Sequence, residues 1–285
     1  MDKLSNNEIL VVVGMHRSTT SLTGQWLKKC GLNIGDRLLG GGTGNEKGHY
    51  EDLDFFDLHR QILSHNNLPE GGVMFPEEKQ FNFQGFENIH LTEYHKKKAQ
   101  SLIDLKNSLY PQWGWKEPRT CLFLSTYLSI LPKGKYLYLF RDYKEVVSSM
   151  IQRDIKHNKK LYYSMKLGKW RFFLKVRELN EKVYQDYNIH LSAWIHYNKC
   201  ALNSLKSSLS DNWLVLENKD LVNHDKKVYD KLTNWGFKLD YHPLKNIFDA
   251  KMLTNKDYLE FDYDPSLKEE ADNLMKQMQS YKAQF

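Results

Sequence analysis

The sequence has little cysteine, and its cysteines are not arranged to build a cross-linked or zinc-bound scaffold. The 285 residues include only Cys30, Cys121 and Cys200, which lie far apart and belong to no CxxC motif or Cys/His cluster. Disulfide frameworks and structural zinc sites need closely patterned ligands, and free thiols are typical of a reducing compartment. We therefore expect no disulfide scaffold, no metal site and a cytoplasmic location.

Long hydrophobic runs and linkers are also missing. The longest early apolar run, Ile9–Val13, is far shorter than a membrane span of about 20 residues or the apolar core of a signal peptide. We therefore expect no membrane span and no export signal. There is no internal repeat and no long Pro- or Ser-rich segment to divide the chain. A single domain over residues 1–285 is the expectation.

The excess of basic charge is small. Lys and Arg number 41 against 35 Asp and Glu, which gives a formal net charge of +6. The basic residues are scattered and form no stripe with stacking aromatics, so a nucleic-acid partner is disfavoured and a phosphorylated or sulfated ligand is favoured. The lysine runs at 96–98 and 159–160 are expected to be solvated surface. An aromatic share of 13% supports a packed core.

Apolar runs that end in polar clusters predict the fold class. Ile9–Val13 is continuous and β-branched, as in a parallel strand buried on both faces, and a helix is expected over about 20–29. Further strands are expected at 113–116, 136–140 and 213–216, and further helices after 142, over 226–235 and after 264. This alternation indicates an α/β fold with a central, mostly parallel sheet flanked by helices.

The first polar cluster, 14–21, reads Gly-Met-His-Arg-Ser-Thr-Thr-Ser. A loop between a strand and a helix offers backbone N–H groups and the positive end of the helix dipole to an anion. A single Ser or Thr here would be an ordinary helix N-cap, but a run of hydroxyl residues beside an arginine favours an anion site. The candidate ligand-binding residues are His16, Arg17, Ser18, Thr19, Thr20 and Ser21.

Two more clusters follow later strands, and ligands bind beyond the carboxyl ends of such strands. Arg141 ends one strand and Ser149 lies eight residues further on, so a guanidinium fork and a hydroxyl can face one crevice. The alternative is that Arg141 only pairs with a nearby carboxylate such as Asp142. Lys116 ends another strand and places a positive charge near the sheet edge, unless it forms an exposed ion pair with Glu117.

A fourth cluster, 45–52, follows a glycine-rich loop and contains His49 and Glu51. A carboxylate or a nearly neutral imidazole on a segment that approaches the site can act as a general base. The alternative is an ordinary hydrated loop.

Taken together, these segments resemble the sulfotransferases that use 3′-phosphoadenosine-5′-phosphosulfate (PAPS), which have a P-loop-like α/β fold. In that superfamily the loop [KR]-S-G-[ST]-[ST] after the first strand holds the 5′-phosphosulfate, and Arg17–Ser21 occupies it here. A strand-ending arginine and a serine eight residues on bind the 3′-phosphate, and Arg141 and Ser149 match both. Lys116–Pro118 is similar to the family's K-[DE]-P, and 45–52 to its N-x-K-G-x-x-E-D segment.

The resemblance covers about residues 9–155 and looks like the bacterial branch. It implies transfer of a sulfuryl group from PAPS to a hydroxyl or amine of a small-molecule, glycan or lipid acceptor, with release of adenosine 3′,5′-bisphosphate and without a metal. It also implies Glu51 as general base, with His49 as second choice. Arg17 and Lys116 would neutralise charge that develops at the bridging oxygen.

Two parts of the family pattern are not matched. Thr19 stands where the family has glycine, a residue that permits close backbone approach and unusual dihedrals, which raises the alternatives of a reshaped loop or weaker donor binding. The late basic loop that grips the 3′-phosphate is not identifiable, and Lys251 and Lys256 are weak candidates for it. His16 is expected to orient backbone or acceptor. Aromatic residues within 162–187 are expected to pack rather than to line an acceptor pocket.

Two other functions stay open at this point. An ATP-dependent P-loop kinase is disfavoured because the loop lacks the Gly-Lys pair of GxxxxGK[ST], whose lysine reaches the terminal phosphates. A catalytically silent nucleotide-binding relative is suggested by Thr19.

Overall fold

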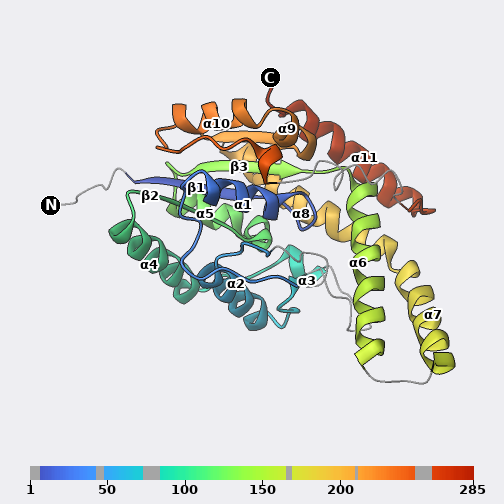
Figure 1. The fold of residues 1–285 in the computed structure, drawn as a ribbon. Coiled ribbons are helices and arrows are strands. Elements are labelled where there is room, and N and C mark those ends of the chain that lie inside the picture. The colour runs from blue at the N-terminus through green and yellow to red at the C-terminus, as the bar shows by residue number, and fades with distance from the viewer. Residues whose placement is uncertain (1–6, 43–47, 73–83, 165–168, 209–210, 248–258) are drawn as a thin grey trace.

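A four-stranded parallel sheet forms the centre of the protein (Figure 1). The computed structural model describes residues 7–42, 48–72, 84–164, 169–208, 211–247 and 259–285. The strands are β1 (Glu8–Val13), β2 (Gln112–Lys116), β3 (Lys135–Phe140) and β4 (Trp213–Glu217), in the order β2-β1-β3-β4 with parallel pairing throughout. These bounds confirm the strands predicted from the apolar runs, and they confirm the α/β class.

Helices connect and cover the strands. They are α1 (Thr20–Lys29), α2 (Leu53–His65), α3 (Gln84–Glu87), α4 (Glu93–Leu109), α5 (Leu124–Ile130), α6 (Tyr143–Ser164), α7 (Lys169–Gln185), α8 (Tyr187–Ser207), α9 (Asn218–Asn223), α10 (Asp225–Asn234) and α11 (Pro265–Ser280). Two short 3-10 turns span Pro118–Phe123 and Leu244–Asn246. The helix predicted over 20–29 is confirmed. The closing helix is confirmed as well, and its N-cap Asp264 accepts from the Ser266 and Leu267 N–H groups.

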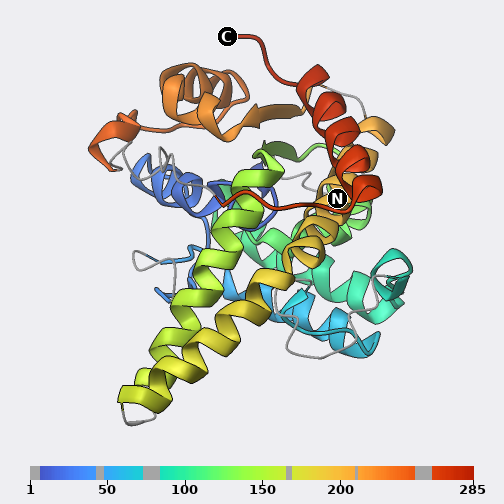
Figure 2. The ribbon, with the colours of Figure 1, turned by 90° about the vertical axis from the view of Figure 1, so that its right-hand side faces the viewer.

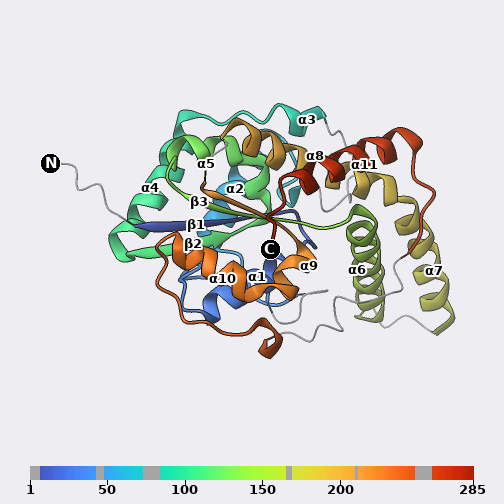
Figure 3. The same cartoon turned by 90° about the horizontal axis from the view of Figure 1, so that it is seen from above.

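Alternate residues of β1 belong to two cores, one on each face of the sheet. Val11 and Val13 pack into the larger core with α2, α4, α5, α8 and α11. Leu10 and Val12 pack into the smaller core with α1, α9 and α10. Figure 3 shows these two helical layers on opposite sides of the strands. Burial on both faces explains why this strand is a continuous apolar run and does not alternate with polar residues.

The parallel arrangement brings the carboxyl ends of the strands to one edge of the sheet. β1 lies between β2 and β3, so the loop that follows Val13 is flanked by the residues that follow Lys116 and Phe140. α6 starts just after β3, and together with α7 it forms a helical pair that projects from the body of the molecule (Figures 1 and 2). Among the described helices, none combines the length and apolarity needed to cross a bilayer.

Candidate functional site

The loop after β1 has a tightly constrained backbone. Gly14 has φ +156°, and a Cβ there would lie 2.5 Å from the Leu139 carbonyl oxygen of β3. A side chain at this position would therefore collide with the neighbouring strand. Arg17 and Thr19 have φ of 67° and 64°, in the left-handed region that is unusual for residues other than glycine. Thr19 thus adopts a conformation that favours glycine, the residue that the family pattern has there.

The start of α1 leaves backbone donors without a side-chain acceptor. Thr19 is the N-cap but its side chain accepts no cap hydrogen bond; its hydroxyl donates to the Ser18 carbonyl oxygen (2.6 Å), and no acidic residue lies in the first turn. First-turn N–H groups have no partner within the helix, and the helix dipole favours negative charge beside them. Among the described residues, the buried Ser18 hydroxyl also has no hydrogen-bond partner. This end of α1 is therefore suited to an anion.

The residues of the second cluster meet this loop directly. Arg17 Nε donates to Ser149 Oγ (2.9 Å), and Arg141 Nη1 donates to the Arg17 carbonyl oxygen (3.1 Å). Arg141 Nε also pairs with Glu145 Oε2 (2.7 Å), so Arg141 does have the nearby carboxylate partner that the alternative expected, although the partner is Glu145. Burial, together with the nearby positive charges of the other arginines, lowers the pKa of Arg17 to about 10, so it stays protonated at pH 7.

Lys116, the residue of the third polar cluster, connects several parts of the site. It is only 1% exposed, and its ammonium donates to Glu51 Oε1 (2.9 Å), the His49 carbonyl oxygen (3.0 Å) and Ser21 Oγ (3.2 Å). The alternative of an exposed pair between Lys116 and Glu117 is wrong, because both side chains are buried and Lys116 pairs with Glu51 instead. One lysine thus joins the residue predicted as general base to the end of the anion loop.

Backbone pairing also fixes the position of Glu51. The Leu39 N–H donates to the Glu51 carbonyl oxygen (2.8 Å), and the His49 N–H donates to the Leu39 carbonyl oxygen (3.2 Å). Glu51 itself is 4% exposed. The predicted alternative of a hydrated loop is therefore wrong for this residue.

Both histidines of the site are held in the neutral form. Burial lowers the pKa of His49 below its usual value, and it lowers that of His16 much further, with added effects from the positive charges of Arg119 and Lys116. His16 is buried, and no residue in the described part of the chain forms a hydrogen bond with its Nε2. Its ring meets the Tyr197 ring edge-on, with centroids 5.8 Å apart. An unpaired neutral imidazole beside the anion loop can donate to or accept from a ligand.

A buried polar chain behind Lys116 was not predicted from the sequence. Glu117 pairs with Arg119 (Nη1 to Oε1, 2.6 Å) and accepts a hydrogen bond from Nδ1 of His59. The other ring nitrogen of His59, Nε2, accepts from the Tyr127 hydroxyl (2.8 Å). Burial would raise the pKa of Glu117, but Arg119 and His59 lower it, whereas burial lowers the pKa of His59. An ionised Glu117 between a cation and a neutral imidazole fixes the turn after β2.

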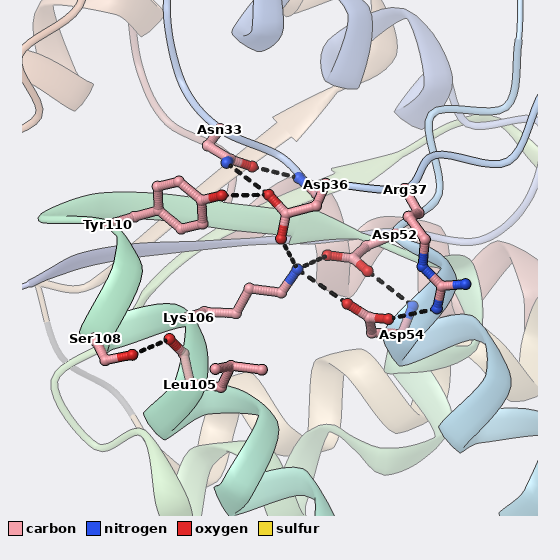
Figure 4. Close-up of polar contacts among 10 residues, drawn as sticks. Asn33, Asp36, Arg37, Asp52, Asp54, Leu105, Lys106, Ser108 and Tyr110 are labelled. Carbon is pink, nitrogen blue, oxygen red and sulfur yellow. Dashed lines mark hydrogen bonds and ion pairs between the residues drawn. The ribbon is translucent and has the colours of Figure 1, made fainter.

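Lys106 forms a second cluster that was not predicted from the sequence, and one of its members is Asp52, the residue that follows Glu51 (Figure 4). Its ammonium lies 2.8 Å from Asp36 Oδ2, 3.1 Å from Asp54 Oδ2 and 3.2 Å from Asp52 Oδ2. The contact with Asp52 is an ion pair without hydrogen-bond geometry, since this Asp52 oxygen has no hydrogen-bond partner among the residues that the structure describes. Asp52 is fully buried and caps α2 by accepting from the Asp54 N–H (2.9 Å).

The charges of this cluster depend on one another. Burial would lower the pKa of Lys106, but the three carboxylates raise it well above its usual value. Hydrogen bonds from Lys106 and Tyr110 lower the pKa of Asp36 to about 2, whereas burial raises the pKa of Asp52. One pattern in the sequence could have revealed the buried lysine. Lys106 follows Ala99 and Ile103 at helical spacing, on the face of α4 that is buried.

Some predicted residues lie outside the described part of the chain. These are Lys251, Lys256, the first residues of the 45–52 segment and the side chains of several aromatics within 162–187. Among the residues that are described, no group of three or more His, Cys, Asp or Glu side chains is placed to hold a metal ion.

Comparison with solved structures identifies sulfotransferases as structural neighbours. The sulfotransferase STF9 from Mycobacterium avium matches over 96% of this chain and 76% of its own, with a TM-score of 0.51 and 13% identity. The sulfotransferase domain from the curacin biosynthetic pathway matches over 98% of this chain and 99% of its own, with a TM-score of 0.49 and 16% identity. No protein-family model and no curated protein matches the sequence. The chain has a sulfotransferase fold, as the resemblance predicted.

Proposed function

We propose that this protein is a sulfotransferase that transfers a sulfuryl group from PAPS to a hydroxyl or amine of a small-molecule, glycan or lipid acceptor. The observation that carries the proposal is the meeting of three chain segments at one edge of the sheet. Arg17 touches both Ser149 and Arg141, and Lys116 links Ser21 of the same loop to Glu51. These are the residues that the sequence resemblance selects, and here they lie in direct contact.

The residues present fit an anionic nucleotide. The uncapped start of α1, the unpaired Ser18 hydroxyl and the Arg17 guanidinium would hold the 5′-phosphosulfate. Thr19, Thr20 and Ser21 add hydroxyl groups to the same loop. Arg141 and Ser149 would hold the 3′-phosphate. When bound, the donor supplies an activated sulfuryl group with adenosine 3′,5′-bisphosphate as the leaving group.

In this proposal the reaction depends on positioning and on fixed positive charge. Glu51 accepts the proton of the acceptor group, and the ion pair with Lys116 holds the Glu51 carboxylate in place for that step. Arg17 and Lys116 stabilise the negative charge that grows on the bridging oxygen. His49 is the alternative base, because its lowered pKa keeps it neutral at pH 7. His16 orients the acceptor.

A binding experiment separates this proposal from an ATP-dependent kinase. We expect adenosine 3′,5′-bisphosphate to raise the melting temperature of the protein, because a ligand that binds only the folded state stabilises it, and we expect ATP with magnesium to do so much less. Arg141→Ala should reduce the shift given by the bisphosphate. A larger shift with ATP–magnesium would contradict the proposal.

A transfer assay separates it from a catalytically silent relative. With labelled PAPS and a panel of alcohols, amines, glycans and lipids, we expect label to appear on at least one class of acceptor. Binding of the bisphosphate without transfer to any class would support the silent relative, which the left-handed Thr19 suggests.

A further inference from the structure

The helical pair α6–α7 concentrates the basic charge of the chain. Residues 155–177 contain eight Lys or Arg residues and no Asp or Glu. The rest of the chain has 33 basic and 35 acidic residues, so the net positive charge of the protein resides in this stretch. The two helices that carry most of this stretch, α6 and α7, project from the body of the molecule (Figures 1 and 2).

Exposed apolar side chains accompany this charge. Phe173 is 61% exposed and Leu174 is 46% exposed, while Val176 and Val183 on α7 are buried. α7 therefore has one apolar face that packs inside the protein and large apolar groups outside it. Lys159, Lys160 and Arg171 are exposed on the same pair of helices. We call the described residues of this stretch, 155–164 and 169–177, the basic arm.

This combination suits an anionic lipid surface better than other polyanions. Anionic headgroups neutralise lysine and arginine, and the boundary between headgroups and acyl chains takes up phenylalanine and leucine. A nucleic acid or an acidic peptide would satisfy the charges, but it would leave Leu174 in water. Isolated exposed apolar residues are common on soluble proteins. Here two adjacent ones lie among exposed basic residues, of which Lys175 and Arg177 pair with Glu178 and Glu181 on the same helix, so the side chains that favour a lipid surface are the exposed Lys159, Lys160 and Arg171 together with Phe173 and Leu174.

We propose that the basic arm docks this protein onto the surface of an anionic lipid bilayer. Lysines and arginines of the arm contact the headgroups, and Phe173 and Leu174 enter the interface. The proposal does not depend on the sulfotransferase activity. It concerns binding to a membrane surface, not crossing it.

Vesicle sedimentation with the full-length protein tests the proposal. We expect binding to vesicles of phosphatidylcholine mixed with phosphatidylserine, little binding to phosphatidylcholine alone, and release as salt screens the charges. Lys159→Gln/Lys160→Gln should weaken binding about 25-fold, at about fivefold for each charge near an anionic surface. Phe173→Ser/Leu174→Ser should weaken it at least about tenfold.

A matched control removes the same charge elsewhere. Lys96 and Lys97 are exposed neighbours on α4, and Lys96→Gln/Lys97→Gln should leave vesicle binding unchanged within about twofold. All the substituted side chains are exposed, so the melting temperatures should match that of the wild type.

Three outcomes would overturn the proposal. These are no binding to the anionic vesicles, an equal loss of binding in the control variant, and salt-dependent binding to single-stranded DNA or polyglutamate without binding to vesicles. The last result would assign the arm to a soluble polyanion.

Discussion

Replacing Lys106 by methionine should destabilise the protein strongly, because it leaves a buried carboxylate without a cation. Asp36 keeps its contacts with Tyr110 and Asn33, and Asp54 keeps its ion pair with Arg37 (2.8 Å). Asp52 is fully buried and Lys106 is its cation. Removal of one partner of a buried ion pair costs about 3–5 kcal/mol. We expect that loss in the free energy of unfolding at pH 7.

Urea denaturation followed by tryptophan fluorescence measures this loss. In a separate thermal unfolding experiment, the melting temperature should fall by at least about 6 °C, at about 2 °C or more per kcal/mol for a domain of this size. In a double-mutant cycle, adding Asp52→Asn should recover part of the stability lost in Lys106→Met, because the unpaired charge is gone. A loss below about 1 kcal/mol, or no coupling in the cycle, would refute the assignment of Lys106 as the buried partner of Asp52.

The Lys106 cluster also predicts how the stability lost in Lys106→Met changes with pH. The folded pKa of Asp36 is lowered to about 2, so its stabilising contribution is present above the unfolded value of about 3.9 and is lost as pH falls toward 2. The pKa of Lys106 is raised, so the contribution of Lys106 is present below about 10.4 and is lost only as pH rises above that value. The stability gap between wild type and Lys106→Met should therefore narrow from pH 4 to pH 2 in acid-titrated urea curves.

Three further substitutions test the site. Glu51→Gln should lower kcat about 100- to 10,000-fold, the range for loss of a general base, with unchanged affinity for adenosine 3′,5′-bisphosphate by calorimetry; near-normal turnover would eliminate Glu51 as the base. Arg141→Ala should raise the KM for PAPS with a smaller effect on kcat, and an unchanged KM would count against a role at the 3′-phosphate. Gly14→Ala should cost at least about 2 kcal/mol of stability by thermal unfolding, because its Cβ would lie 2.5 Å from the Leu139 carbonyl oxygen. Gly31→Ala is the control, since Gly31 also has a positive φ but a Cβ added there would meet no atom within 4 Å, and it should cost about 1–2 kcal/mol; equal losses would show that close packing at Gly14 is unimportant.

The strands and helices of the fold could be predicted from local sequence patterns. A β-branched run such as Ile9–Val13 specifies a strand buried on both faces, and the Asp264-Pro265 start specifies the closing helix, because these signals act over a few residues. Ion pairs between residues far apart in the sequence could not be predicted from such local patterns. The Lys116–Glu51 contact joins residues 65 positions apart, and it depends on how β2 places the lysine and how backbone pairing with Leu39 places Glu51.

Burial of charged groups was the main property that local patterns missed. Glu117 looked like an exposed partner of Lys116, yet it is fully buried between His59 and Arg119. Lys106 was not noticed at all. The carboxylates around Lys106 come from residues 36–54, so the charges near it in the sequence do not reveal them, and only its helical spacing from Ala99 and Ile103 indicates burial. The cation of Glu117 is Arg119, two residues further on, but its other partner, His59, is distant in the sequence. The roles of the site residues, the single-domain organisation and the cytoplasmic location stay predictions.

The two buried lysines have a consequence for which sequence changes the protein can tolerate during evolution. Lys106 and Lys116 lie ten positions apart, on α4 and β2. Lys106 pairs with Asp52 and Asp54, and Lys116 contacts the His49 carbonyl oxygen and the Glu51 carboxylate. The carboxylate proposed for chemistry is thus tethered to the scaffold downstream of residue 48. Exposed positions of the neighbouring described loop can then change while Glu51 keeps its place, because the groups that hold Glu51 are buried and come from other parts of the chain.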